Sequence, residues 1–287
     1  MTFSKTKLKN ILFAFFVILF LPPCQSFVAA DVVCTECDNV KVVGEIDKGD
    51  FCKLIKCLSK FIENGKPKAV ELKGDKYSGS PVGWVTFNSV GGDVQEAIKI
   101  GRFLREGLVE VVIHEKCYSS CFTAVTGAIK VYEGSDIFGE VGIHRMFLDK
   151  KTLINMNMQE YEKVYNKIKM GARNYFIDMD VPVSIIEKIF TIPSGDLYIL
   201  KGKESEFLWK NPPAYDEWIE ARCPNPFSKE EQKDFRRYRD SFYQKGLFSE
   251  GYTDYLNKKN SEFEDCREDF RWKQFKKTVN KYLKKCK

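Results

Sequence analysis

Short runs rich in β-branched residues alternate with amphipathic stretches between residues 41 and 179 of this 287-residue chain. The short runs predict strands, because they are apolar and are bounded by glycine or charged residues: 41–46, 83–89, 109–115 and 140–147. The longer stretches predict helices: 49–65, 93–107, 120–128 and 157–179. Strands that alternate with helices favour an α/β fold around a mostly parallel sheet, with functional loops at the carboxyl ends of the strands.

The composition changes at "CPNPFSKEEQKDF", which begins at Cys223. Residues 223–287 contain no strand candidate and hold 17 Lys or Arg against 11 Asp or Glu, whereas residues 31–222 hold 26 against 29. We therefore expect one domain of catalytic size over residues 31–222, followed by a basic, aromatic, helical C-terminal appendage over residues 223–287.

The last predicted helix places Phe275, Val279, Leu283 and Cys286 on one stripe, while residues 271–287 carry eight basic groups and no acid. We expect the stripe to dock on the protein and the basic face to be solvated. Contact of that face with an anionic membrane surface is the alternative. Residues 31–287 are close to neutral overall, so we expect no nucleic-acid partner.

The amino terminus has the pattern of a secretory signal peptide. Three lysines precede an apolar run, Ile11 to Leu21, which two prolines follow. This run is shorter than the roughly 18–20 residues that span a bilayer. We expect residues 1–30 to be removed and the protein to be exported, with an uncleaved membrane anchor as the alternative.

Nine cysteines follow residue 30. In an exported protein such cysteines predict disulfides, and an odd number leaves one thiol free or bonded to another chain. The pairs Cys34/Cys37 and Cys52/Cys57 have zinc-like spacing, but no histidine lies near them in the sequence. We therefore expect no metal site.

Three features indicate chemistry. The segment "KCYSSCFTAV", residues 116–125, puts Ser119 and Ser120 between two cysteines. An imidazole base would have to be His114 or His144, because the chain has only two histidines. A glycine pair at 91–92 follows a predicted strand, where backbone N–H groups can serve an oxyanion hole or a phosphate cradle, or simply form a tight turn.

Five motifs occur in order: "GEI" at 44–46, "NSVGGD" at 88–93, "CYSSC" at 117–121, "GIHR" at 142–145 and "SGDLYIL" at 194–200. This order resembles the ClpP-type serine peptidases of the ClpP/crotonase superfamily, and most closely their exported bacterial relatives with C-x-S-x-C and G-[IV]-H-R motifs. The resemblance covers about residues 40–210. It implies a core of ββα repeats and a location in the periplasm or cell envelope.

The resemblance also implies the roles of site residues. The nucleophile would be Ser119, with Ser120 as the alternative, and the general base would be His144. The orienting acid would be Asp196, with Asp178 and Asp180 as competitors. The glycine pair, Gly91 and Gly92, would stabilise the oxyanion.

Two residues depart from the family pattern, since Val90 replaces the usual proline of the glycine loop and Tyr118 precedes the nucleophile in place of a small residue.

A Cys117–Cys121 bridge would close a five-residue loop around the serines, with a stabilisation of only about 2 kcal/mol. The alternative is that both cysteines bond elsewhere and the serines merely cap the helix.

The sequence thus favours an exported serine hydrolase, most consistent with an ATP-independent peptidase that acts on short or unfolded polypeptides and needs no cofactor. The sequence leaves open whether the protein forms a homo-oligomer. A catalytically inactive binding or assembly protein of the same fold is the main alternative. Crotonase-like chemistry on a thioester and a Ser-Lys peptidase are weaker readings.

Overall fold

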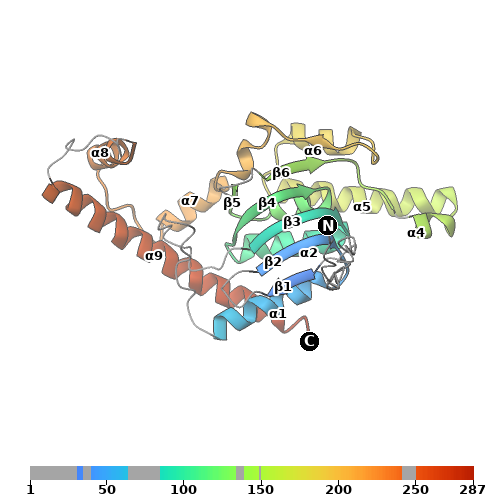
Figure 1. Ribbon diagram of the computed structural model, residues 1–287, viewed down its shortest axis with the longest axis horizontal. Helices are drawn as coiled ribbons and strands as arrows, with labels where there is room; N and C mark the ends of the chain where they lie inside the picture. Colours follow the sequence, from blue (N-terminus) through green and yellow to red (C-terminus); the bar gives the residue numbers. More distant parts are fainter. Residues whose placement is uncertain (1–30, 35–39, 64–84, 134–138, 149, 241–249) are drawn as a thin grey trace, which may run out of the picture.

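The computed structural model describes residues 31–34, 40–63, 85–133, 139–148, 150–240 and 250–287. The expected signal peptide, residues 1–30, lies outside them. The described residues form an α/β structure in which a curved mixed sheet is surrounded by helices, and one long helix crosses its edge (Figure 1). The α/β class predicted from the sequence is therefore confirmed.

The strands of the sheet are β1 (Asp31–Cys34), β2 (Val40–Ile46), β3 (Val85–Gly92), β4 (Glu110–Tyr118), β5 (Lys130–Glu133), β6 (Glu140–Ile143) and β7 (Tyr198–Ile199). The α-helices are α1 (Asp50–Glu63), α2 (Val94–Glu106), α3 (Ser120–Val125), α4 (Lys150–Ile154), α5 (Met158–Asp178), α6 (Val183–Thr191), α7 (Pro213–Glu220), α8 (Lys229–Asp240) and α9 (Glu250–Leu283). Two short 3-10 helices span Gly202–Glu204 and Glu206–Leu208.

The sheet has the order β1-β2-β3-β4-β6-β7, and β5 also pairs with β4. The central pairings from β2 to β6 are parallel, whereas β1 and β7 pair antiparallel at the two ends. Helices α1 and α2 connect successive parallel strands, as expected for βαβ units. Because β3, β4 and β6 are parallel, their carboxyl ends lie at one edge of the sheet.

Strand β4 changes partners along its length. Its first part, Glu110–Ile113, pairs with β5, and its last part, Lys116–Tyr118, pairs with β6. Between them the register with β3 shifts, and Glu115 has a φ of 64°. Such a bulge bends a strand and redirects the side chains beyond it. The end of β4 is thereby aimed between β3 and β6, where the expected nucleophile lies.

The core lies between the sheet and the helices that pack on it. Helices α2, α3 and α5 contact one another, and α3 also lies against β3. The largest buried side chains of this core come from strands and helices alike, and include Phe87, Phe103, Phe122, Tyr175 and Phe176.

The C-terminal half of α9 belongs to the same core. It packs on α1 and α2, and Phe275 and Val279 are fully buried there. Leu283 and Cys286 are partly buried against that core. The predicted stripe is therefore the docked face of α9, and the boundary expected at residue 222 divides residues that share one core. The other half of α9 extends beyond the sheet toward α8 (Figure 1).

Four disulfides join cysteines of the described residues: Cys34–Cys57, Cys52–Cys286, Cys117–Cys121 and Cys223–Cys266. Cys37 lies outside the described residues. Several disulfides in one chain indicate an oxidising environment such as the extracellular space. Across the described ranges, no helix combines the length and the apolar character that a membrane span requires.

Candidate active site

Ser119 occupies a sharp turn between β4 and α3. Its backbone has φ 56° and ψ −122°, a conformation that L-residues rarely adopt. Its N–H donates to the carbonyl oxygen of Gly142 on β6 at 2.9 Å, which holds the turn against the neighbouring strand. Its hydroxyl makes no capping hydrogen bond to α3. A serine in a strained strand-to-helix turn is the geometry by which several hydrolases present a nucleophilic hydroxyl.

Two features fix this turn from either side. The Cys117–Cys121 disulfide bridges the end of β4 to the start of α3, and both cysteines are buried. On the other side, Gly91 lies directly against the turn, because a Cβ added there would be 2.6 Å from the Ser119 Cβ and 2.9 Å from the Tyr118 carbonyl oxygen. Only glycine fits this approach, and its φ of 105° also favours glycine.

The glycine pair ends β3 and turns the chain into α2. Gly92 has a φ of 137°, and a Cβ there would overlap the backbone of Ile46. The N–H of Gly91 donates to the Ser89 hydroxyl at 3.1 Å. Of the expected oxyanion pair, Gly91 borders Ser119, but its N–H is engaged within its own loop and would have to change partner to reach a substrate.

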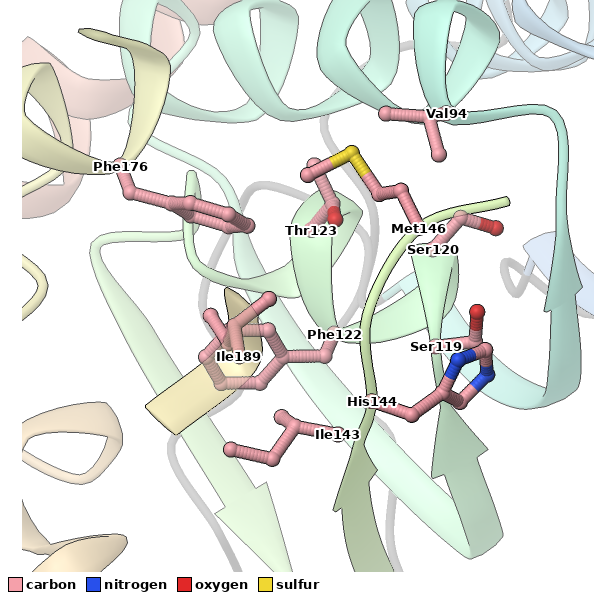
Figure 2. Close-up of a pocket in the computed structure, with 10 residues that line it drawn as sticks. All are labelled: Val94, Ser119, Ser120, Phe122, Thr123, Ile143, His144, Met146, Phe176 and Ile189. Carbon is pink, nitrogen blue, oxygen red and sulfur yellow. The ribbon is translucent and has the colours of Figure 1, made fainter. Parts of the chain in front are cut away.

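Ser119 and His144 line one pocket at the carboxyl edge of the sheet (Figure 2). The pocket is small and partly open to solvent. In Figure 2 the Ser119 side chain lies beside the His144 ring. Ser120 and Thr123 also line the pocket, and its apolar wall comprises Val94, Phe122, Ile143, Met146, Phe176 and Ile189.

His144 follows the last residue of β6. Its Nδ1 lies 2.9 Å from the carbonyl oxygen of Arg145, and its ring stacks on Phe147 with the centroids 5.9 Å apart. A carbonyl oxygen can only accept, so this hydrogen bond requires a proton on Nδ1. The neutral imidazole then has Nε2 unprotonated, which is the tautomer that a general base needs.

None of the three carboxylates considered as orienting acids lines the pocket. Asp196 is exposed in the turn before β7, where its N–H donates to the Pro193 carbonyl. Strand β7 pairs with β6, so Asp196 lies near the end of the strand that leads to His144, but within the described residues no hydrogen bond or ion pair joins the two. Asp178 and Asp180 form ion pairs with Arg102 and Arg105 at the end of α5.

His114 and Tyr118 are both outside the pocket. His114 is exposed on β4, with its Nδ1 3.8 Å from a Glu115 carboxylate oxygen. The Tyr118 hydroxyl donates to Glu140 at 2.6 Å, and this hydrogen bond raises the pKa of Tyr118 to about 12. Tyr118 packs over Gly142 and is not part of the pocket wall, so it does not narrow the space beside Ser119.

The two serines differ in exposure. Ser119 is partly exposed, whereas Ser120 is 1% exposed and its hydroxyl has no hydrogen-bond partner among the described residues. The apolar wall could not be predicted from the sequence, because its residues come from α2, α3, α5, α6, β6 and the segment after β6. Residues of an apolar wall look like ordinary core residues in a sequence.

Three of the cysteines with zinc-like spacing near the amino terminus form disulfides. Cys34, Cys52 and Cys57 are all in disulfides, so their sulfurs are not free to bind a metal. Within the described ranges no cluster of three or more His, Cys, Asp or Glu side chains has the arrangement of a metal site.

No protein-family model matches this chain, and no curated protein sequence matches it.

Proposed function

We propose that this protein is a serine hydrolase whose nucleophile is Ser119 and whose general base is His144. The observation that carries the proposal is that Ser119, held in a strained strand-to-helix turn, shares a pocket with His144. Strain of this kind costs about 1–3 kcal/mol and persists only where surrounding structure enforces it. Here a disulfide, a close glycine and the hydrogen bond that the Ser119 N–H donates to β6 enforce it.

In the proposed reaction the Ser119 hydroxyl oxygen attacks a substrate carbonyl while Nε2 of His144 accepts the hydroxyl proton. The tetrahedral oxyanion is stabilised by backbone N–H groups of the glycine loop. His144 then gives its proton to the leaving group, and the carbonyl–leaving-group bond breaks to form an acyl-enzyme. Water, deprotonated by His144, attacks the ester and releases the acid and the free serine.

The orienting group for His144 is a separate part of the proposal. The sequence resemblance assigns this role to Asp196, while the hydrogen bond to the Arg145 carbonyl already fixes the required tautomer. A serine–histidine pair with a backbone acceptor explains the geometry without a carboxylate. Asp196 would contribute only if the turn before β7 moved toward His144.

The finer predictions of fold and substrate also belong to this proposal. A ClpP-like core is supported by the position of the glycine loop, the serine and the histidine, each at the carboxyl end of a parallel strand. Export is supported by the four disulfides. An exported peptidase has no ATP-driven unfoldase, so its substrates would be short or already unfolded. Assembly of identical chains, and contact of the basic face of α9 with a membrane surface, stay predictions.

A non-catalytic binding protein of the same fold is the second candidate. It is favoured by the engaged N–H of Gly91 and by the lack of a hydrogen bond between Ser119 and His144 in the described residues. In apo hydrolases catalytic hydrogen bonds are often long and tighten only with substrate, so these contacts alone do not decide between the candidates.

Hydrolysis of activated ester and peptide substrates by the purified protein decides between them. We expect His144→Ala to lower kcat/KM by at least about 10³-fold, because the serine loses its base. His114→Ala is the matched control, since His114 lies outside the pocket, and it should stay within a few fold of the wild type. Turnover that survives His144→Ala would overturn the role of His144 as the base, whereas complete absence of turnover in the wild type would favour the binding protein.

The same assay separates the two orienting groups. If the Arg145 carbonyl is sufficient, Asp196→Asn changes kcat by less than about 5-fold, whereas an orienting carboxylate would make the loss about 10²-fold or more.

A further inference from the structure

Ser120 is a buried hydroxyl without a partner inside the candidate active site. It is 1% exposed, it lines the pocket, and its Oγ makes no hydrogen bond within the described residues. Most buried side-chain hydroxyls in proteins are hydrogen-bonded, because an unpaired polar group keeps its full desolvation cost. The neighbouring buried serine, Ser89, is bonded to the Gly91 amide. Ser120 therefore differs from an ordinary core serine.

The surroundings of this hydroxyl are those of a small, selective pocket. Its wall is mostly apolar, formed by side chains such as Met146, Phe176 and Ile189, and little open volume is left between them. Figure 2 shows Ser119 and Ser120 at successive positions, with the Met146 side chain extending toward Thr123 of α3. A group that enters from Ser119 would thus meet a mostly apolar wall, in which the polar side chains are Ser120 and Thr123.

Burial argues against a nucleophilic role for Ser120 itself. A nucleophile must reach both the substrate carbonyl and the base, and the partly exposed Ser119 is the serine that lies beside the His144 ring (Figure 2). Ser120 is better suited to recognise a substrate group that enters the pocket.

We propose that Ser120 determines specificity by hydrogen bonding to a small hydroxyl-bearing side chain, such as that of serine, on the acyl side of the scissile bond. This inference rests on the proposed hydrolase function and names its substrate class. The apolar wall limits the size of the side chain, and the unpaired hydroxyl selects for a polar atom in it. Sites that hydrogen-bond a substrate hydroxyl discriminate against the analogue that lacks it, because the site's own polar group is then left unpaired.

A matched pair of peptide substrates tests this proposal. One carries serine on the acyl side of the cleaved bond and the other carries 2-aminobutyrate, in which a methyl group replaces the hydroxyl at nearly the same size. We expect the wild type to favour the serine substrate by about 10-fold or more in kcat/KM. In Ser120→Ala the two values should agree within about 2-fold, mainly through loss of activity on the serine substrate.

Ser205→Ala is the matched control, because Ser205 is also buried but its hydroxyl donates to the Gly202 carbonyl outside the pocket. This variant should keep the wild-type preference. The thermal midpoint gives a second measurement. Ser120→Ala should not lower it, since the removed hydroxyl has no partner, whereas a structural role for Ser120 would lower it.

The outcomes separate the two proposals. An active wild type with equal rates on both substrates, or a preference that survives Ser120→Ala, overturns the role of Ser120 and leaves the hydrolase intact. A wild type that hydrolyses neither substrate nor any activated ester overturns both. Loss of all activity in Ser120→Ala, together with normal activity in Ser119→Ala, would make Ser120 the nucleophile and overturn the specificity role.

Discussion

Two disulfides of this protein differ in what they stabilise: one holds a local turn and the other links distant parts of the chain. Cys117–Cys121 joins residues four positions apart at the β4–α3 turn, whereas Cys52–Cys286 joins α1 to the end of the chain across 234 positions. In the chain-entropy account the short loop contributes about 2 kcal/mol and the long one about 5 kcal/mol. The long bridge therefore acts on the stability of the whole molecule, while the short one has mainly a local effect on the Ser119 turn.

The surroundings of the two bridges reinforce this difference. Around the end of α9 the contacts are those of a core, with Phe275 buried and with ion pairs Arg271–Glu110 and Lys281–Glu106. Around the Ser119 turn the structure tolerates a strained backbone and an unpaired buried hydroxyl. The α9 contact is thus held by apolar burial and ion pairs, whereas the Ser119 turn combines a disulfide with a strained backbone at the place where chemistry is proposed.

Replacing both Cys52 and Cys286 by serine should have the largest effect on stability. We expect the free energy of unfolding to fall by about 5 kcal/mol, because the unfolded chain regains the entropy of a long loop. Urea denaturation measures this loss. Reaction of Ser119 with an active-site reagent under native conditions should be unchanged, and a parallel loss of that reactivity would mean that the two regions are coupled.

Arg271→Met should have the next largest effect. Arg271 and Glu110 are 3.0 Å apart and both side chains are about nine-tenths buried. Removing the arginine leaves a buried carboxylate uncompensated, at a cost of about 3–5 kcal/mol. The double variant Arg271→Met/Glu110→Leu is the control, and urea denaturation should show that it recovers most of the lost free energy of unfolding. If the losses of the two single variants simply add, the pair does not interact.

Replacing Cys117 and Cys121 by serine should lower the free energy of unfolding by only about 2 kcal/mol. The rate at which Ser119 is modified should nevertheless fall by about 10-fold or more, because the strained turn is no longer held. A large stability loss with normal reactivity would reverse the proposed roles of the two bridges.

The smallest expected effect lies at the contact between α8 and α9. Hydrogen bonds from Lys259, from the Ser228 N–H and from Tyr255 lower the pKa of Glu231 to about 2. Because the pKa is lowered in the folded protein, the stabilisation is present above the ordinary value near 4.5 and is lost as the pH falls from there toward 2.

Hydrogen exchange of α8, measured from pH 4.5 toward pH 2, should become faster as the contact with α9 is lost. The reactivity of Ser119, measured after each sample is returned to neutral pH, should stay constant. Glu230→Gln, on an exposed neighbour, should leave the exchange profile unchanged and Glu231→Gln should flatten it. An unchanged profile in Glu231→Gln would mean that this carboxylate does not hold the contact.

The sequence predicted the elements where local pattern decides. The helix expected at 93–107 is α2, Val94–Glu106, because Asp93 caps its start and Gly107 follows its end. The strand expected at 140–147 ends at Ile143, because the Arg145 N–H donates to the Ile192 carbonyl at the end of α6. That contact joins residues 47 positions apart and has no local signature.

The site shows the same division. The serine turn, the glycine pair and the histidine follow strands, so their positions could be expected from strand order. The Cys52–Cys286 pairing depends on how two distant segments meet in the fold. The hydrogen bond of His144 depends on the orientation of one backbone carbonyl. The resemblance favoured Ser119 over Ser120 as the nucleophile, but the burial of Ser120 could not be predicted, since only the fold buries it.

Mapping the residue modified by a fluorophosphonate tests the central claim most directly. The reagent attaches covalently to a serine only when a base activates it. Peptide mass spectrometry of the labelled wild type should find the adduct on Ser119, and the adduct should be absent from Ser119→Ala and nearly absent from His144→Ala. An adduct on Ser120, labelling that persists without His144, or no adduct in the folded wild type would contradict the account.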